Sequence, residues 1–183
     1  MTKAKIFLIG IAAASIALLA GIYAGAQRTN SPQHTAPPLA EENIGRLFSS
    51  TLLDTSEKSY SFAQWRGKIL VVNFWAAWCP PCRDEMPGFS RLQTKFAANG
   101  VQFVGIALDS SDMVREFALQ HPSTYPLVIG GTEGVELARL LGNPQLALPY
   151  TLIINATGEV RFARLGGLSE QELDALLRES TAR

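Results

Sequence analysis

The cysteines of this 183-residue chain, Cys79 and Cys82, are the residues whose types and spacing most directly suggest chemistry. Two thiols so spaced can form a structural disulfide, act as a reversible dithiol couple, or supply half of a metal site. A disulfide that closes so short a loop adds little stability, because the stabilisation grows with loop length. A zinc site needs further ligands, and His34 and His121 are not spaced as partners of the pair. The spacing therefore favours a redox couple over a metal site or a structural disulfide. A redox couple of this kind implies no metal ion or organic cofactor.

The residues on either side of the pair predict a buried strand before it and a helix after it. The run Ile69–Trp75 is β-branched and aromatic, which is typical of a strand buried on both faces. A helix is expected over Pro80–Ala98, because Pro80 suits a first helical position and Asn99-Gly100 is a helix stop. Cys79 would then stand at the helix N-terminus, where free N–H groups and the helix dipole favour a thiolate.

This geometry predicts different roles for the two thiols. Cys82 lies one helical turn after Cys79 on the same side of the helix, so a disulfide between them needs little backbone movement. Cys79 is nearer to the positive end of the dipole and more exposed, and we expect it to attack the disulfide of a partner. Cys82, which is more buried, would then resolve the mixed disulfide by attacking Cys79.

The longer segment Asn73-Phe-Trp-Ala-Ala-Trp-Cys-Pro-Pro-Cys82, continued by Arg83-Asp-Glu-Met-Pro87, resembles the active-site segment of the thioredoxin superfamily. It is most similar to the TlpA/ResA/CcmG-type thiol–disulfide oxidoreductases, which are membrane-anchored and act outside the cytoplasm. The resemblance runs from about Leu47 to the C-terminus. It implies a thioredoxin fold, with Asp112–His121 as the helical insert of the family. Members mostly reduce disulfides outside the cytoplasm, often in cytochrome c or cytochrome oxidase assembly or in sporulation.

The resemblance also extends to individual residues. Pro149 precedes a strand where the family has a cis-proline that faces the cysteine pair, although an ordinary turn proline is the plainer interpretation. Glu85 stands where the family has an acid that manages active-site protons, and a solvated acid near a helix start is the alternative. Ordinary thioredoxin uses a buried Asp at the position of Asn73, which cannot take a proton. The family often has Thr where Tyr150 follows the proline here. The resemblance implies a substrate-binding surface made of Trp78, Pro80, Pro81, Leu148, Pro149 and Tyr150.

The remaining elements predict an α/β domain. Leu47–Leu53 and Ser59–Phe62 are expected to form an N-terminal β-hairpin around a turn at Asp54–Lys58. Alternating strands and helices after it predict a mainly parallel sheet covered by helices on both faces, with an antiparallel hairpin at its edge. The expected fold class is a thioredoxin fold, in which helices flank a central mixed sheet, with the N-terminal hairpin and the central helical insert. Further strands are expected at Val101–Leu108, Leu127–Ile129, Tyr150–Ile154 and Val160–Arg164, and further helices at Met113–Gln120, Glu133–Leu141 and Ser169–Glu179.

Residues 1–26 have the pattern of an export signal. Lys3 and Lys5 precede the uncharged run Ile6–Tyr23, which as a helix is nearly long enough to cross a bilayer. Ala24-Gly25-Ala26 resembles a signal-peptidase site, but the run exceeds the usual apolar length of a cleavable signal, so a retained single-pass anchor is favoured. Both alternatives leave the N-terminus inside and the rest of the chain outside the cytoplasm. Residues 27–43 are typical of a polar linker, and residues 44–183 form the expected folded domain.

Composition and the resemblance together limit the classes of molecule that are expected to bind this protein. Lys+Arg 16 balances Asp+Glu 16 and no basic block interleaves with aromatic residues, which argues against nucleic acid. The resemblance implies a disulfide-bearing exported protein as substrate and a membrane thiol transporter of the DsbD or CcdA kind as electron donor. Two alternatives stay open, namely an oxidase that donates its disulfide and a non-catalytic module that binds apo-proteins and has a structural disulfide. A peroxiredoxin is disfavoured because no Pro-x-x-x-Thr-x-x-Cys run occurs.

Overall fold

The structure, a computed structural model, describes residues 40–182. This range includes the predicted folded domain except for Arg183. The predicted signal-anchor segment at residues 1–26 and residues 27–39 of the predicted linker lie outside the described residues. Within the described range, no helix is both long enough and apolar enough to cross a membrane.

Seven strands of this part of the chain form one mixed sheet, in the order β2-β1-β5-β4-β3-β6-β7. At its centre β3 pairs in parallel with β4, and β4 pairs in parallel with β5. The other neighbouring pairs are antiparallel. A mixed sheet was expected, but the prediction that it is mainly parallel is wrong. The strands are β1 (Thr51–Asp54), β2 (Ser59–Ser61), β3 (Ile69–Trp75), β4 (Val101–Ala107), β5 (Leu127–Ile129), β6 (Tyr150–Ile154) and β7 (Val160–Leu165).

The path of the chain on either side of β5 explains the antiparallel pairs. Tyr150, the first residue of β6, pairs with Phe74 near the end of β3. The connection into β6 therefore returns the chain to the edge of the sheet at which β3 ends, so that β6 runs in the opposite direction. On the other side, the N-terminal hairpin adds to β5 in the antiparallel sense, with Leu53 opposite Ile129.

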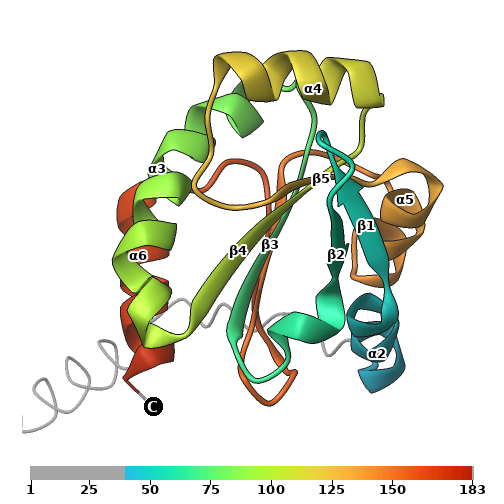
Figure 1. Cartoon of the computed structure of the whole chain (residues 1–183). Coiled ribbons are helices and arrows are strands. Elements are labelled where there is room, and N and C mark those ends of the chain that lie inside the picture. The colour runs from blue at the N-terminus through green and yellow to red at the C-terminus, as the bar shows by residue number, and fades with distance from the viewer. Residues whose placement is uncertain (1–39, 183) are drawn as a thin grey trace, which may run out of the picture. The chain divides into compact units, whose positions relative to one another are not determined.

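Helices cover both faces of the sheet (Figure 1). α3 (Pro80–Phe96) and α6 (Glu170–Thr181) lie side by side on one face. α2 (Glu41–Ser49) and α5 (Gly131–Leu140) lie on the other face. α4 (Ser111–Gln120), the predicted insert, lies across the end of the domain near the start of α3. The sheet is thus a central layer between two pairs of helices.

Alternate residues of β3 point into two separate cores. Val71 and Trp75 belong to the core beneath α3 and α6, which also contains both cysteines. Leu70 and Phe74 belong to the core beneath α2 and α5. Every residue of β3 is buried, as the continuous apolar run predicted. The strand that leads to the cysteine pair is therefore fixed by packing on both of its faces.

Helix α2 corrects the assignment of the first elements. The predicted linker extended to residue 43 and the predicted hairpin began at Leu47, but residues 41–49 are helical and the first strand begins at Thr51. The buried residues of this helix are Ile44, Leu47 and Phe48. Residues three and four positions apart lie on one helical face, so this set forms an apolar side that packs on the sheet.

Helix α3, which contains Cys82, begins where the sequence predicts and ends at Phe96, two residues before the predicted end at Ala98. Pro80 is its first residue. It continues into a short 3-10 turn at Ala97–Asn99 and is closed by Gly100 in the left-handed conformation, with φ of 79°. α6 begins as its capping-box pattern predicts, because the side chain of Ser169 accepts a hydrogen bond from the backbone N–H of Glu172.

Candidate active site

Cys79 and Cys82 form a disulfide at the N-terminus of α3, with their Cα atoms 5.3 Å apart. Cys79 is the N-cap residue of the helix, and its carbonyl oxygen accepts a hydrogen bond from Arg83 N at 3.2 Å. Cys82 is completely buried, whereas Cys79 retains 3% exposure. This order of exposure agrees with the sequence-based expectation. A thiolate at Cys79 would be stabilised by the free N–H groups of the first helical turn.

Exposed side chains surround the pair on the surface. Trp78 is 64% exposed, and Pro80 and Pro81 are exposed as well. Trp75, by contrast, is completely buried, as expected for a core residue. The loop after β7 lies against Pro81, since a β-carbon on Gly167 would be 3.9 Å from Pro81 Cβ. The cysteine pair therefore opens onto an apolar surface with a backbone loop at one side.

Pro149 is buried and stands just before β6. The Leu148–Pro149 peptide bond is cis, as predicted. Pro149 O accepts a hydrogen bond from Gly166 N at 2.8 Å, which ties the proline to the loop that lies against Pro81. Leu148 is half-buried, and neither its N–H nor its C=O has a hydrogen bond to another of the described residues. An extended chain can pair with the backbone at this point.

The side chain of Tyr150 does not belong to the same surface. It is buried in the core beneath α2 and α5, and its ring stacks on Phe74 with 6.2 Å between the centroids. Its hydroxyl donates a hydrogen bond to Leu141 O at 2.7 Å. Because the cysteines lie in the core on the opposite face of the sheet, the expected place of the Tyr150 side chain in a substrate-binding surface is wrong. Its side chain has a structural role instead.

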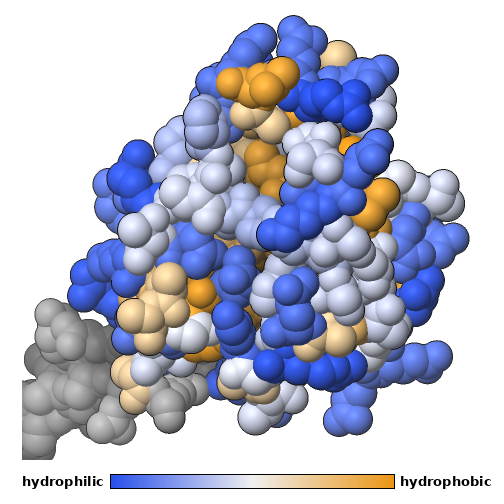
Figure 2. Space-filling view, in the orientation of Figure 1, coloured by the Kyte–Doolittle hydropathy of each residue, from blue (hydrophilic) through white to orange (hydrophobic). Residues whose placement is uncertain are grey.

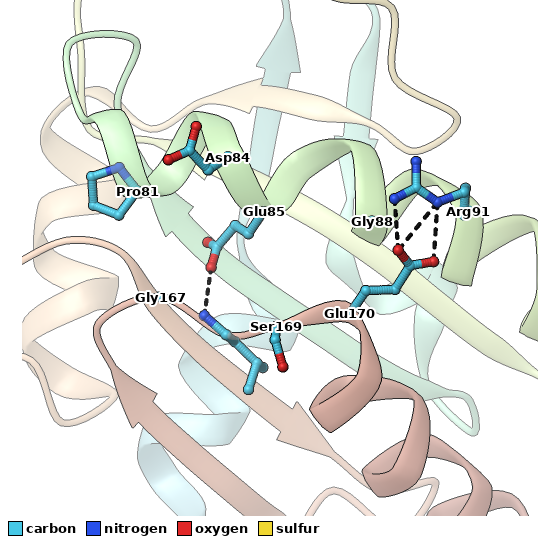
Figure 3. Close-up of a pocket in the computed structure, with 9 residues that line it drawn as sticks. Pro81, Asp84, Glu85, Gly88, Arg91, Gly167, Ser169 and Glu170 are labelled. Atoms are coloured by element: carbon cyan, nitrogen blue, oxygen red, sulfur yellow. Dashed lines mark hydrogen bonds and ion pairs between the residues drawn. The ribbon is translucent and has the colours of Figure 1, made fainter.

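Glu85 is a residue of α3 and is buried, with 7% of its surface exposed. It lies on the buried side of the helix, as Cys82 does. Its Oε1 accepts a hydrogen bond from Asn73 Nδ2 at 2.8 Å. Its Oε2 accepts one from Leu168 N at 3.0 Å (Figure 3). Asn73 Nδ2 also donates to Thr151 Oγ1 at 3.0 Å. The alternative of a solvated acid near the helix start is therefore wrong.

Burial raises the pKa of Glu85 from its ordinary value of 4.5 to about 7. Two hydrogen bonds oppose this effect because they stabilise the charged form: first the one from the Leu168 N–H, then the one from the Asn73 amide. A carboxyl group with this pKa gains and loses a proton near neutral pH. That property suits a general acid or base.

A cleft of about 310 Å³ opens beside Glu85, between α3 and the segment that leads into α6 (Figure 3). Asp84 points away from the Glu85 carboxylate, toward the outside of the helix. At the far end of the cleft, Arg91 and Glu170 form a bidentate ion pair, with 2.6 Å from Nη2 to Oε2 and 3.0 Å from Nε to Oε1. The cleft gives water access to a carboxyl group that is otherwise enclosed. Its lining residues are Pro81, Asp84, Glu85, Gly88, Arg91, Gly167, Leu168, Ser169 and Glu170.

The insert is tied to the loop that precedes the cysteines. Asp109 Oδ2, at the end of β4 and just before α4, accepts a hydrogen bond from Ala77 N at 2.9 Å. Two apolar side chains of α4, Met113 and Leu119, are 44% and 81% exposed, and Figure 2 shows apolar surface over this helix. The insert therefore presents apolar side chains of its own at the surface.

Three residues of the site were missed by sequence reasoning. Asp109 follows a buried parallel strand at the edge where such strands end, and this position could have identified it. Thr151 is a polar residue in a short apolar run, which could have suggested a buried polar partner. Leu168 acts through its backbone N–H, so its side chain carries no signal of the contact.

Within residues 40–182, no group of three or more His, Cys, Asp or Glu side chains is placed to hold a metal ion. His34 lies outside the described residues. His121 stacks on Phe117, with 4.3 Å between the ring centroids, and its Nδ1 is 3.2 Å from Phe117 O. The chemistry that the site residues themselves offer is that of a dithiol couple beside one titratable carboxyl group.

Comparison with known proteins agrees with this arrangement. The model of the AhpC/TSA family matches residues 44–163. Among curated proteins, the chain is 29% identical over 129 residues to the thiol-disulfide oxidoreductase ResA of Bacillus thuringiensis subsp. konkukian. This alignment covers 70% of this chain and 72% of that protein.

Solved structures confirm the predicted thioredoxin-like fold. A thiol:disulfide interchange protein of the thioredoxin family from Chlorobium tepidum TLS is 27% identical, with a TM-score of 0.66, and the match covers 80% of this chain and 99% of that one. A secreted disulfide oxidoreductase of Mycobacterium tuberculosis, homologous to E. coli DsbE, is 21% identical, with a TM-score of 0.61, and the match covers 76% and 99%. At 21% identity, this second match supports only the assignment of the fold.

Proposed function

We propose, from the premise that this chain belongs to the AhpC/TSA family and is a thiol–disulfide oxidoreductase related to ResA, that it reduces disulfides in exported partner proteins. The proposal rests on one observation: the Cys79–Cys82 pair lies at the start of α3, and the same helix carries the buried carboxyl group of Glu85. An attacking thiol, a resolving thiol and a proton acceptor thus lie within the first turns of one helix.

The proposed reaction has two exchange steps. The Cys79 thiolate attacks the partner's disulfide, an S–S bond forms between Cys79 and one partner sulfur, and the other partner sulfur leaves as a thiolate. Cys82 then gives its thiol proton to the Glu85 carboxylate and attacks Cys79 Sγ. The second partner sulfur leaves as a thiolate, so two electrons have passed to the partner and the Cys79–Cys82 disulfide has formed. That disulfide is the state seen in the structure.

The partner would bind on the surface formed by Trp78, Pro80, Pro81, Leu148 and Pro149. The unpaired backbone groups of Leu148 suit an extended segment of the partner, which would add there as a short strand. The exposed indole of Trp78 offers apolar contact beside Cys79. Exported proteins that are incompletely folded present such extended segments.

The proposed direction requires a supply of electrons, because the space outside the cytoplasm is oxidising. We propose a membrane thiol transporter of the DsbD or CcdA kind as the donor, and residues 1–26 as a retained membrane anchor that keeps the domain in the extracytoplasmic space. N-terminal sequencing of the mature protein from membranes tests the anchor. A mature N-terminus at Gln27 would contradict it.

The reduction potential of the Cys79–Cys82 couple tests the direction. Equilibration of the full-length protein against glutathione and dithiothreitol buffers is expected to give about −270 mV or lower, the range of a reductant. A value near about −120 mV would instead assign the chain to the disulfide-donating oxidases.

An insulin-reduction assay with dithiothreitol tests whether the pair is catalytic. Cys79→Ser is expected to abolish the activity, and Cys82→Ser to accumulate the mixed disulfide with the substrate, which a non-reducing gel detects. A Cys79→Ser protein as active as wild type would favour the non-catalytic binding module. Glu85→Gln is expected to slow the resolving step and to shift the titration of Cys82, whereas an unchanged titration would remove Glu85 from the reaction.

A further inference from the structure

Asn73 is the polar residue of a strand that is otherwise apolar and completely buried. It is 1% exposed, and its amide nitrogen uses both hydrogens, one toward Glu85 Oε1 at 2.8 Å and one toward Thr151 Oγ1 at 3.0 Å. Its Oδ1 is buried and has no hydrogen-bond partner among the described residues. A buried amide that leaves its oxygen unpaired is costly, so its presence here calls for a specific reason.

We propose that Asn73 is a positioning residue for the proton step at Glu85. Its amide presents N–H to the ionised carboxylate and turns over to present Oδ1 once Glu85 has taken a proton. The inference rests on the proposed function in one respect, namely that Glu85 receives the proton of Cys82. It adds to that function a side chain, Asn73, that changes its orientation when Glu85 gains or loses the proton.

The reason lies in the donors and acceptors around the carboxyl group. An ionised carboxylate only accepts hydrogen bonds, whereas a protonated one has an O–H that must donate. Both present neighbours of Glu85 are donors, namely Asn73 Nδ2 at Oε1 and Leu168 N at Oε2. A backbone N–H cannot become an acceptor. A half turn of the Asn73 amide, in contrast, exchanges an N–H for a carbonyl oxygen at the same place.

Thr151 makes this turn feasible without losing the second contact. Its hydroxyl accepts a hydrogen bond from Asn73 Nδ2 in the present state. A hydroxyl group can rotate and donate instead, so Thr151 Oγ1–H can bond to Oδ1 after the turn. Thr151 is itself completely buried, so water does not compete for that bond. The turn also moves the two amide hydrogens to the place where Oδ1 now lies without a partner, so the turned orientation is favoured only while Glu85 holds a proton.

Of the described protein groups that hydrogen-bond to Glu85, only the Asn73 amide can exchange a donor for an acceptor. Among the described residues, Tyr125 is the further titratable group whose electrostatic interaction with Glu85 is resolved, but it is not one of the hydrogen-bond partners of the carboxyl group. Asp84, Arg91 and Glu170 line the cleft, where Asp84 points away and the other two pair with each other. The cysteines are bonded to each other in this state, and as thiols they are the source of the proton.

Nuclear magnetic resonance of the full-length wild-type protein tests the turn directly. The side-chain amide resonances of Asn73 are expected to titrate with the same midpoint as the Glu85 carboxyl carbon. The Overhauser contact between the Asn73 amide hydrogens and Thr151 is expected well above that midpoint and to be lost well below it. Gln93 is the internal control, because it is also a buried amide beneath α3, but its Oε1 accepts from Phe103 N at 2.7 Å. Its amide resonances are expected not to titrate over the same range.

A variant measures the influence of Asn73 on Glu85. Asn73→Leu keeps the approximate volume and removes the donor, and it is expected to raise the Glu85 midpoint by about one pKa unit or more, since a hydrogen bond to a charged group is at stake. An unchanged midpoint, or Asn73–Thr151 contacts that do not change with pH in the wild type, would overturn the proposal. The wild-type measurement decides even if the variant does not fold.

These outcomes are separable from those for the proposed function. If Glu85→Gln leaves the titration of Cys82 unchanged, Glu85 is not the acceptor of that proton and the proposed reaction fails. The amide measurement follows Asn73 itself and does not depend on activity. A titrating Asn73 amide together with an unaffected Cys82 would therefore keep the turn and reject its role in disulfide reduction.

Discussion

Replacing Glu85 with Gln is expected to change how the stability of the domain depends on pH. Burial holds the pKa of Glu85 at about 7 in the folded protein, whereas its ordinary value of 4.5 applies in the unfolded chain. Between these values the folded state keeps a proton that the unfolded state has lost, so the free energy of unfolding falls as pH rises. The stabilising contribution is complete below about pH 4.5 and is lost as pH rises through about 7.

The magnitude follows from the separation of the two pKa values. The separation between 4.5 and about 7 is about 2.5 units, and each unit corresponds to about 1.4 kcal/mol. Wild-type protein is therefore expected to lose about 3 kcal/mol of unfolding free energy through this group between about pH 4 and about pH 8.5. Glu85→Gln lacks the titrating group but keeps all other carboxyl groups. The difference between the two proteins isolates the contribution of Glu85.

Urea unfolding of the oxidised proteins, followed by tryptophan fluorescence at a series of pH values, measures this difference. The unfolding free energy of the wild type, relative to that of Glu85→Gln, is expected to fall by about 3 kcal/mol as the pH rises across the range. Most of this change is expected between the two pKa values. Curves that stay parallel within about 1 kcal/mol would show that the Glu85 carboxyl group has an ordinary pKa. The reasoning from its burial would then be wrong.

Three further sets of substitutions test packing and hydrogen bonds away from the cysteine pair. Gly105→Ala is expected to lower the unfolding free energy by about 1–3 kcal/mol, because its β-carbon would lie 2.8 Å from a leucine methyl carbon of β5. Gly45→Ala, in α2 and with no atom within 4 Å, is the matched control and is expected to raise it by about 0.5–1 kcal/mol, and urea unfolding measures both. Tyr150→Phe loses the bond to Leu141 O and is expected to cost about 1 kcal/mol while insulin reduction stays unchanged, which parallel stability and activity assays check. Ser169→Ala removes the N-cap of α6 and is expected to cost about 1 kcal/mol, seen as faster amide hydrogen exchange in its first turn.

The parts of the fold that local patterns determine were predicted well. The buried strand Ile69–Trp75 and the helix that begins at Pro80 follow from apolar continuity and from proline and glycine positions. Helix α2 is hard to predict because polar residues precede it and the apolar pair Leu47-Phe48 also suits the start of a strand. The direction of β6 was missed for a different reason. It depends on where the preceding connection places the chain, which no local pattern specifies.

The candidate active site also has features that the sequence predicts and features that it does not. The relation of Glu85 to Cys82 is local to one helix, and spacing alone predicted that they share a side. The partners of Glu85 are separated from it by 12 positions for Asn73 and 83 for Leu168, and only the folded arrangement brings them together. The raised pKa of Glu85 results from that enclosure. The chemistry-bearing residues could therefore be named from the sequence, but their electrostatics could not.

The two edge strands of the sheet, β2 and β7, affect how readily an unfolded chain can add to the sheet. β2 has three residues, and β7 carries the exposed charge of Arg161 and pairs with β6 through a register shift at Ile153/Ile154. Short length, edge charge and irregular pairing each hinder an exposed sheet edge from templating a strand of another molecule. For a protein proposed to act on incompletely folded substrates, this protects against co-aggregation with them. The backbone beside Pro149, which we propose as the substrate-binding point, would then accept an extended segment without prolonging a sheet edge.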